Sequence, residues 1–201
     1  MEPEENDAEI SIKAEAFDIM QNYYRTVHRP LIRCMLCFSG RLDANALRRA
    51  AALSTHAVPQ IACRFDPAAC RWKKSCESEL VLVLPEADAG AKALLTGVDF
   101  EKGPQLRLVI VRNGQNDTLC AIVSHLVMDG GGFKEYLYLL AALYSKCLTD
   151  PAFNRAPEPG DRSLAQLFCG YSLKEKQKIL FARSEPIRQE LENATGFHPS
   201  R

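Results

Sequence analysis

Two apolar runs and a long apolar stretch after them constrain the fold of this chain most strongly. Residues 105–112 and 118–124 are rich in β-branched side chains, and turn formers fill the five positions between them. This pattern predicts an antiparallel hairpin. Residues 131–148 are apolar nearly all round a helix. The sequence therefore predicts a helix buried against a sheet that contains the hairpin.

The junction between the hairpin and that helix carries a short motif. Residues 124–130 read Ser-His-Leu-Val-Met-Asp-Gly, which is an HxxxDG pattern. Histidine is the residue type that titrates near neutral pH, so His125 is a candidate general base. Asp129 is placed to fold back and fix the local backbone, while Gly130 permits a positive φ. A strand-end histidine before an ordinary Asp-Gly turn is the alternative, because a short motif alone is weak evidence.

The first half of the chain adds elements of both types. The expected elements are a helix at 14–25, a strand at 31–38, a helix at 43–56, a hairpin of strands at 60–65 and 70–73, and a strand at 80–84. Asp43 is a plausible N-cap of the second helix, and Pro85 ends the last strand. The fold class that follows is α/β, with a mixed, largely antiparallel sheet packed with helices in a two-layer sandwich.

Proline and glycine concentrate between residues 149 and 162, where we expect a linker. Two later Ser-x-x-Gln/Glu pairs, which begin at Ser163 and Ser172, have the spacing of a capping box and predict two helices. We therefore divide the chain into a lobe over residues 1–150 and a segment of linker and helices over residues 151–201.

The charge balance bears on the partners of the chain. Its 201 residues include 25 Lys and Arg and 25 Asp and Glu, so no net field attracts nucleic acid or an anionic lipid surface. No apolar run approaches the length of a membrane span, and the acidic N-terminal residues do not resemble a signal peptide. We expect a cytoplasmic protein that binds neither nucleic acid nor a membrane.

Eight cysteines raise the question of a metal site or disulfides. Cys34 and Cys37 form a Cys-x-x-Cys, but both fall in an expected strand, where residues three apart point to opposite faces. Such a pair cannot converge on one ion, so we expect no metal site. Most of the thiols are interpreted as small core side chains.

These residues resemble the superfamily of condensation-domain and chloramphenicol-acetyltransferase-like acyltransferases, which use thioester donors. The matching landmarks are residues 16–21, 40–43, 59–65 and 103–108, the HxxxDG run, and residues 133–144. They extend over roughly residues 14–148. The combination is far more specific than the motif alone.

The resemblance implies roles for the motif residues. His125 matches the histidine that removes a proton from the attacking hydroxyl or amine as it adds to the thioester carbonyl. Asp129 and Gly130 match the aspartate and glycine that organise the loop. The family typically holds this aspartate through an arginine ion pair, and the candidates here are Arg64 and Arg107.

Two further positions are candidates for substrate binding. The amide of Gly131 is a candidate to face a developing oxyanion. Ser124 stands where the family often has a second histidine, which leaves His125 as the sole base. The sequence thus predicts one base and one backbone donor, with no covalent enzyme intermediate.

The resemblance implies an acyltransferase, or its N-terminal half, that moves an acyl group to an alcohol or amine. The donor is acyl-CoA or an acyl-phosphopantetheine carrier protein, as in nonribosomal peptide synthesis, and no cofactor is bound tightly. Condensation enzymes have two similar lobes around a tunnel, so we expect a second lobe or self-association, with residues 151–201 starting the crossover. Two alternatives stay open: a non-catalytic lobe that serves binding or assembly, and a generic α/β binder with an incidental motif.

Overall fold

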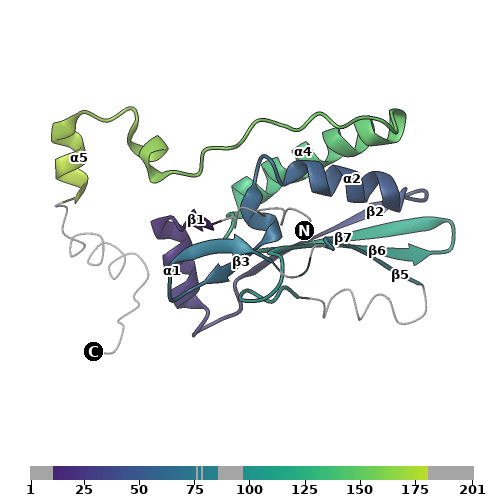
Figure 1. The fold of residues 1–201 in the computed structure, drawn as a ribbon, viewed down its shortest axis with the longest axis horizontal. Helices are drawn as coiled ribbons and strands as arrows, with labels where there is room; N and C mark the ends of the chain where they lie inside the picture. The colour runs from purple at the N-terminus through teal and green to yellow at the C-terminus, as the bar shows by residue number, and fades with distance from the viewer. Residues whose placement is uncertain (1–10, 76, 78, 86–96, 181–201) are drawn as a thin grey trace, which may run out of the picture. The chain divides into compact units, whose positions relative to one another are not determined.

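The computed structural model of the protein describes residues 11–75, 77, 79–85 and 97–180 (Figure 1). Its elements, with η for a 3-10 helix, are β1 (Ser11–Lys13), α1 (Ala16–Tyr24), β2 (Leu31–Phe38), α2 (Ala44–Ser54), η1 (Pro59–Ala62), β3 (Cys63–Asp66), β4 (Arg71–Lys74), β5 (Val81–Leu84), β6 (Leu106–Asn113), β7 (Asn116–Ser124), α4 (Gly130–Thr149), η2 (Leu164–Phe168) and α5 (Leu173–Leu180). The chain divides into two compact units, Met1–Asp161 and Arg162–Arg201.

Two sheets form in the first unit. The larger has the strand order β2-β7-β6-β5, in which β5 runs parallel to β6 and the other pairs are antiparallel. The smaller has the order β1-β4-β3 and is antiparallel throughout. Helices α2 and α4 pack against each other and lie over one face of the larger sheet (Figure 1). The predicted α/β class, with a mixed and largely antiparallel sheet under helices, is confirmed.

The core explains why β7 is apolar along nearly its whole length. On the face beneath the helices, Leu119 and Ala121 pack into the main core together with Ile110 of β6. On the opposite face, Cys120 and Ile122 are also fully buried and belong to a second apolar cluster. A strand that is covered on both faces needs apolar side chains at successive positions, as a central strand does.

The sequence prediction of β2 and α2 is confirmed. The bounds of β2 are those expected, and Asp43 caps α2 by accepting hydrogen bonds from the backbone N–H groups of Asn45 and Ala46, at 2.8 and 2.9 Å. Cys34 and Cys37 lie in β2 opposite Ala121 and Thr118, respectively, and therefore on opposite faces of the sheet. The pattern of apolar residues in the strand and the N-cap aspartate of the helix were therefore sufficient to predict both elements from the sequence.

The connection between β6 and β7 is shorter than predicted. It consists of Gly114 and Gln115, and Gly114 has a φ of 56°, which suits a two-residue hairpin turn. The pattern predicts Asp117 as a turn residue, but it lies within β7 and is buried against Arg112. The ion pair with Arg112 across the two strands stabilises Asp117 in β7, although aspartate is a residue type that favours turns.

Helix α4 is less buried than its composition predicted. The side chains that it buries are Phe133, Tyr136, Leu140, Leu143 and Cys147. Its opposite side leaves Tyr138 62% exposed and Leu148 52% exposed. The predicted burial against the sheet is confirmed, although within the described part of the structure only one face of α4 is covered.

Part of the expected linker packs on the first unit. The Arg49 guanidinium donates hydrogen bonds to the carbonyl oxygens of Cys147, Asp150 and Pro151, and the Gly160 N–H donates to the Ala57 carbonyl at 2.9 Å. These bonds hold the chain against the end of α2 as far as residue 160.

The second unit contains two short helices among the described residues. The first, η2, is a 3-10 helix. A capping box begins α5, since the Ser172 hydroxyl and N–H both donate to Glu175, at 2.6 and 2.7 Å, and these two bonds, the hydroxyl's first, lower the pKa of the Glu175 carboxyl. Any part of this second expected helix beyond residue 180 lies outside the described residues. Within the described segments, no helix combines the length and hydropathy needed to cross a membrane.

Candidate functional site

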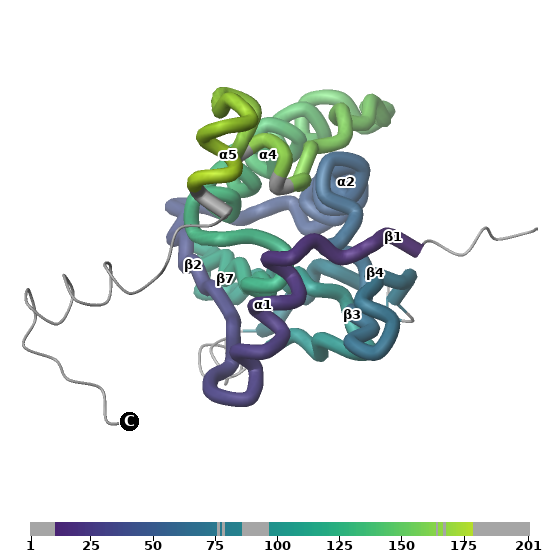
Figure 2. Tube along the Cα trace, turned by 90° about the vertical axis from the view of Figure 1, so that its left-hand side faces the viewer, coloured from purple at the N-terminus to yellow at the C-terminus, as the bar shows by residue number. Residues whose placement is uncertain are grey.

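His125 directly follows β7 and is held by two neighbouring segments. Its backbone N–H donates to the Pro30 carbonyl at 2.8 Å, which continues the pairing of β2 with β7 by one residue. Its imidazole lies beside the ring of Phe17 in α1, with 5.9 Å between centroids. Figure 2 shows α1 next to β2 and β7 at this end of the sheet. The ring is therefore positioned by α1 as well as by the strand.

The two ring nitrogens of His125 differ in their surroundings. Nδ1 is buried and has no hydrogen-bond partner among the described residues, while the residue as a whole is half-buried. Nδ1 is therefore shielded from a group that approaches from outside, which leaves Nε2 as the candidate proton acceptor. For Nε2 to accept a proton, the neutral imidazole must carry its hydrogen on Nδ1.

Asp129 folds back onto its own loop. It is the N-cap of α4, and its Oδ1 accepts a hydrogen bond from the Gly132 N–H at 2.7 Å. A Cβ on Gly132 would stand 3.3 Å from both that oxygen and the Cβ of Met128, so a glycine at this position accommodates the cap. By capping the first turn of α4, Asp129 thus holds the end of the loop that follows His125.

Replacing Asp129 with alanine should lower the free energy of unfolding by about 1 kcal/mol, because an N-cap acceptor is lost. Asp129→Asn should retain most of that stability, since its side-chain oxygen accepts the same hydrogen bond. Urea denaturation of the three proteins checks this prediction. Equal stability of the alanine variant and the unchanged protein would contradict it.

Gly130 and Gly131 form the first turn of α4. The expectation of a positive φ at Gly130 is wrong: it is the first helical residue, and a Cβ there would meet nothing within 4 Å. The backbone N–H groups of both glycines donate no hydrogen bond within the described residues. They are therefore available donors at the positive end of a helix, close to the loop of His125.

Ser124 takes part in bonds within the protein. It is fully buried, its Oγ accepts from the Leu126 N–H at 3.2 Å, and its own N–H donates to the Gln105 carbonyl at 2.9 Å. In this structure its hydroxyl shapes the turn after β7. It is not exposed to a molecule that approaches His125.

The arginine candidates do not join Asp129. Arg107 donates to the Glu79 carbonyl and forms an ion pair with Glu77, at the opposite edge of the sheet from β2. Arg64 has no ion pair among the described residues, and none of those residues forms one with Asp129. The predicted arginine link is corrected to a helix cap, which satisfies the carboxylate without a cation.

Sequence reasoning missed the polar link that anchors α1. The Asp18 carboxylate is fully buried and accepts from the Trp72 indole N–H at 2.8 Å and from the Glu15 N–H at 3.0 Å. Trp72 itself is fully buried in β4. This bond connects α1, which carries Phe17, to the smaller sheet. A buried tryptophan requires an acceptor for its N–H, but the sequence does not say which carboxylate supplies it.

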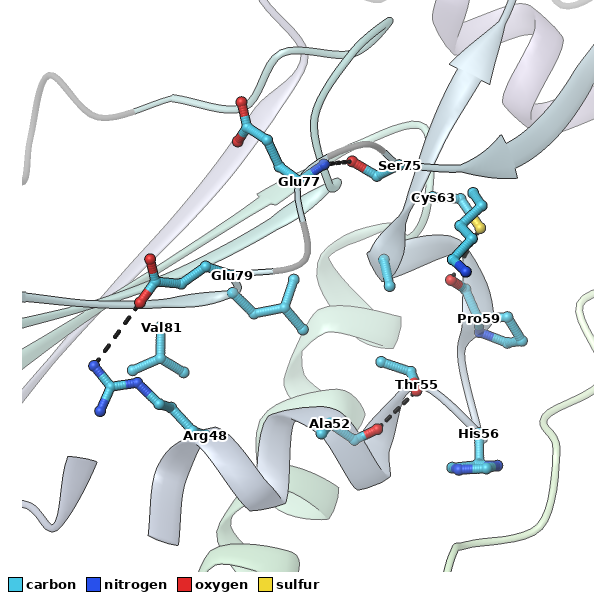
Figure 3. A pocket seen from close by; sticks show the side chains of 13 residues that line it. Arg48, Ala52, Thr55, His56, Pro59, Cys63, Ser75, Glu77, Glu79 and Val81 are labelled. Carbon is cyan, nitrogen blue, oxygen red and sulfur yellow. Dashed lines mark hydrogen bonds and ion pairs between the residues drawn. The ribbon is translucent and has the colours of Figure 1, made fainter. Parts of the chain in front are cut away.

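A pocket of about 600 Å³ lies apart from His125 (Figure 3). Its lining residues come from α2 and the turn after it, η1, the start of β3, the end of β4, and the start of β5 with the segment before it, and none of them belongs to the HxxxDG run. Arg48 and Glu79 form an ion pair at its rim, at 3.8 Å (Figure 3). Because β5 and β7 are separated by β6, this pocket is not the surroundings of the candidate base.

Cys63 lines the same pocket but is unsuited to act as a nucleophile. Burial raises the pKa of its thiol to about 11, and the Sγ–H donates to the Pro59 carbonyl at 3.3 Å. We expect iodoacetamide at pH 7 to modify the exposed Cys37 and Cys169 well before Cys63. Mass spectrometry of briefly labelled protein, with a urea-unfolded sample as the control, checks this order. Early labelling of Cys63 in the folded protein would contradict it.

No protein-family model and no curated protein sequence matches the chain. Solved structures do. The first condensation domain of the calcium-dependent antibiotic synthetase, in complex with substrate analogue 2a, matches with a TM-score of 0.64 and 16% identity, over 95% of this chain and 49% of that chain. The starter condensation domain of rhizomide synthetase RzmA matches with a TM-score of 0.59 and 15% identity, over 94% of this chain and 49% of that chain.

A third similar structure is a complex of the X-domain and OxyB from teicoplanin biosynthesis. It has a TM-score of 0.58 and 16% identity, over 78% of this chain and 36% of that chain. The chain spans about half the length of the two condensation domains and less of the third. Identities this low compare folds, and the fold that they identify is that of a lobe of a condensation domain.

Proposed function

We propose that this chain supplies the general base of an acyl transfer from a thioester to an alcohol or amine. The observation that carries the proposal is His125: its Nδ1 is buried while the residue as a whole is half-buried, and the helix-terminal N–H groups of Gly130 and Gly131, which donate no hydrogen bond within the described residues, follow five and six residues later. The condensation-domain fold supports it, since the lobe resembles those of synthetases that form bonds to carrier-bound acyl groups.

The reaction needs one proton acceptor and a donor for the oxyanion. Nε2 of His125 takes the proton as the acceptor oxygen or nitrogen bonds to the thioester carbonyl carbon. The carbonyl oxygen then carries the negative charge, which the Gly131 N–H at the start of α4 stabilises. Collapse of the tetrahedral species breaks the C–S bond, and the proton on His125 passes to the leaving thiolate. Holding both substrates close supplies much of the acceleration.

The donor that we propose is acyl-CoA or an acyl-phosphopantetheine carrier protein, as in nonribosomal peptide synthesis. The acceptor is an alcohol or amine. Because the chain spans about half of the condensation domains that it resembles, we also propose that the complete tunnel requires a second lobe or a second copy of this chain.

Thiol release tests this function. Acetyl-CoA, longer acyl-CoA thioesters and an acyl carrier protein are each incubated with a panel of amines and alcohols, and free thiol is measured with and without acceptor. Release that requires both the acceptor and His125 supports the proposal. Release that is independent of His125 contradicts it, as does the absence of release from folded chain after a second lobe is restored.

A second candidate is a non-catalytic lobe used for binding or assembly. Exposed apolar side chains favour it: Val27 is 81% exposed, Tyr23 74% and Met35 53%. Such side chains near α1 and on the edge strand β2 are typical of a surface that another protein covers. Light scattering after size exclusion tests this, because a concentration-dependent dimer without thiol release favours assembly over catalysis.

A further inference from the structure

A second pocket, of about 450 Å³, includes a residue from the segment that precedes β2. It is lined by Arg25, Arg29 and residues 97–100. Arg29 directly precedes Pro30, whose carbonyl accepts the hydrogen bond from the His125 N–H. Consecutive Cα atoms are about 3.8 Å apart. The backbone of Arg29, which lines the pocket, is therefore next to Pro30, the residue that holds His125 by a hydrogen bond.

Arg25 is a fixed part of the wall. Its guanidinium lies over the ring of Phe100, at 4.8 Å from the centroid. It also donates to Asn22 at 2.9 Å and forms an ion pair with Glu101 at 2.8 Å. Since Glu101 offsets its charge, Arg25 contributes shape and partial charge rather than a free cation.

Arg29 is the cation without a counter-ion in this pocket. It forms no ion pair and no hydrogen bond through its side chain within the described residues. Its guanidinium rests against Gly97, where an added Cβ would stand 2.4 Å from Nη2. An alanine at position 97 would make the guanidinium shift, so the glycine permits the close approach seen here.

One carboxylate also lines the pocket. Asp99 accepts hydrogen bonds from the backbone N–H groups of Glu101 and Lys102 through Oδ1, at 3.0 and 3.1 Å. These bonds direct Oδ1 toward the turn that Asp99 begins, and Asp99 forms no ion pair with Arg29 among the described residues. The Arg29 guanidinium is therefore not bound to this carboxylate and keeps its N–H donors for a ligand.

We propose that this pocket binds the phosphate of the pantetheine arm of the thioester donor. The inference rests on the proposed function, because CoA and carrier-bound phosphopantetheine share a phosphate at one end of pantetheine and a thioester at the other. A guanidinium binds phosphate through paired N–H donors, which a lysine does not match. The long arm then leads from Arg29 along the loop before β2 to His125.

Binding of 4′-phosphopantetheine, followed by titration calorimetry or NMR, tests the site without any turnover. We expect Arg29→Gln to weaken binding about 10- to 100-fold, as the loss of one charge-assisted contact does. Gly97→Ala should weaken it by a smaller factor, because it shifts the end of the flexible Arg29 side chain and keeps the charge. Arg48→Gln removes the same charge at the other pocket and should leave binding unchanged. Pantetheine without phosphate should bind the Arg29 variant and the unchanged protein equally.

Kinetics separate this inference from the proposed function and separate the two donor sources. Arg29→Gln should raise the KM of acyl-CoA or of acyl carrier protein, whichever donor uses the pocket, with kcat unchanged, and leave acyl-pantetheine unaffected. Equal loss with acyl-pantetheine, or unchanged phosphopantetheine binding in Arg29→Gln, would overturn the phosphate site. Arg29-dependent binding without His125-dependent transfer supports the site and contradicts catalysis.

Discussion

Replacing His125 with alanine should lower acceptor-dependent thiol release by about 10²- to 10⁴-fold, which is the usual contribution of a general base. The fold should persist, because the backbone bond from residue 125 to the Pro30 carbonyl does not need the imidazole, and only the ring contact with Phe17 is lost. Steady-state rates at matched folded concentration, together with circular dichroism, measure both parts of this prediction.

The matched control is His56→Ala. His56 is exposed and lines the separate pocket near β5, so its loss removes a histidine without touching the HxxxDG loop (Figure 3). Its variant should turn over at the rate of the unchanged protein. If the two histidine variants lose activity equally, His125 has no special part in the reaction; if neither does, it is not the base.

Local patterns predicted the elements but not all of their partners. The alternation at 31–38, the cap at Asp43 and the apolar runs around residues 105–124 determined type and position, because each signal is complete within its own segment. Strand β1 escaped notice, since its three residues become a strand only by pairing with β4. Gly130 likewise fits the helix rather than a left-handed turn, because Asp129 already supplies the cap.

For the candidate site too, the sequence predicted features within one segment but not the contacts between distant segments. The motif identified His125 and the fold-back of Asp129, because both depend on spacing along one short loop. It did not indicate that Phe17 lies against the imidazole or that Arg29 rests on Gly97, because those contacts join segments far apart in the sequence. The proposed Arg107 link failed for the same reason: its real partner, Glu77, comes from another loop.

Arg112 and Asp117 form the pair whose disruption should most destabilise the fold. The Asp117 side chain is fully buried, and it accepts hydrogen bonds from Arg112 and from the Leu42 N–H, the latter at 2.6 Å. Arg112 also donates to the Leu42 carbonyl at 3.0 Å. The pair thereby joins the β6–β7 hairpin to the loop before α2.

Arg112→Ala should lower the free energy of unfolding by about 3–5 kcal/mol, because it leaves a buried carboxylate without its cation. The double variant Arg112→Ala, Asp117→Asn removes that stranded charge and keeps a side-chain acceptor for the Leu42 N–H, so it should be more stable than the single variant. Urea denaturation of the full chain measures both. A single variant within about 1 kcal/mol of the unchanged protein would show that water, rather than Arg112, satisfies Asp117.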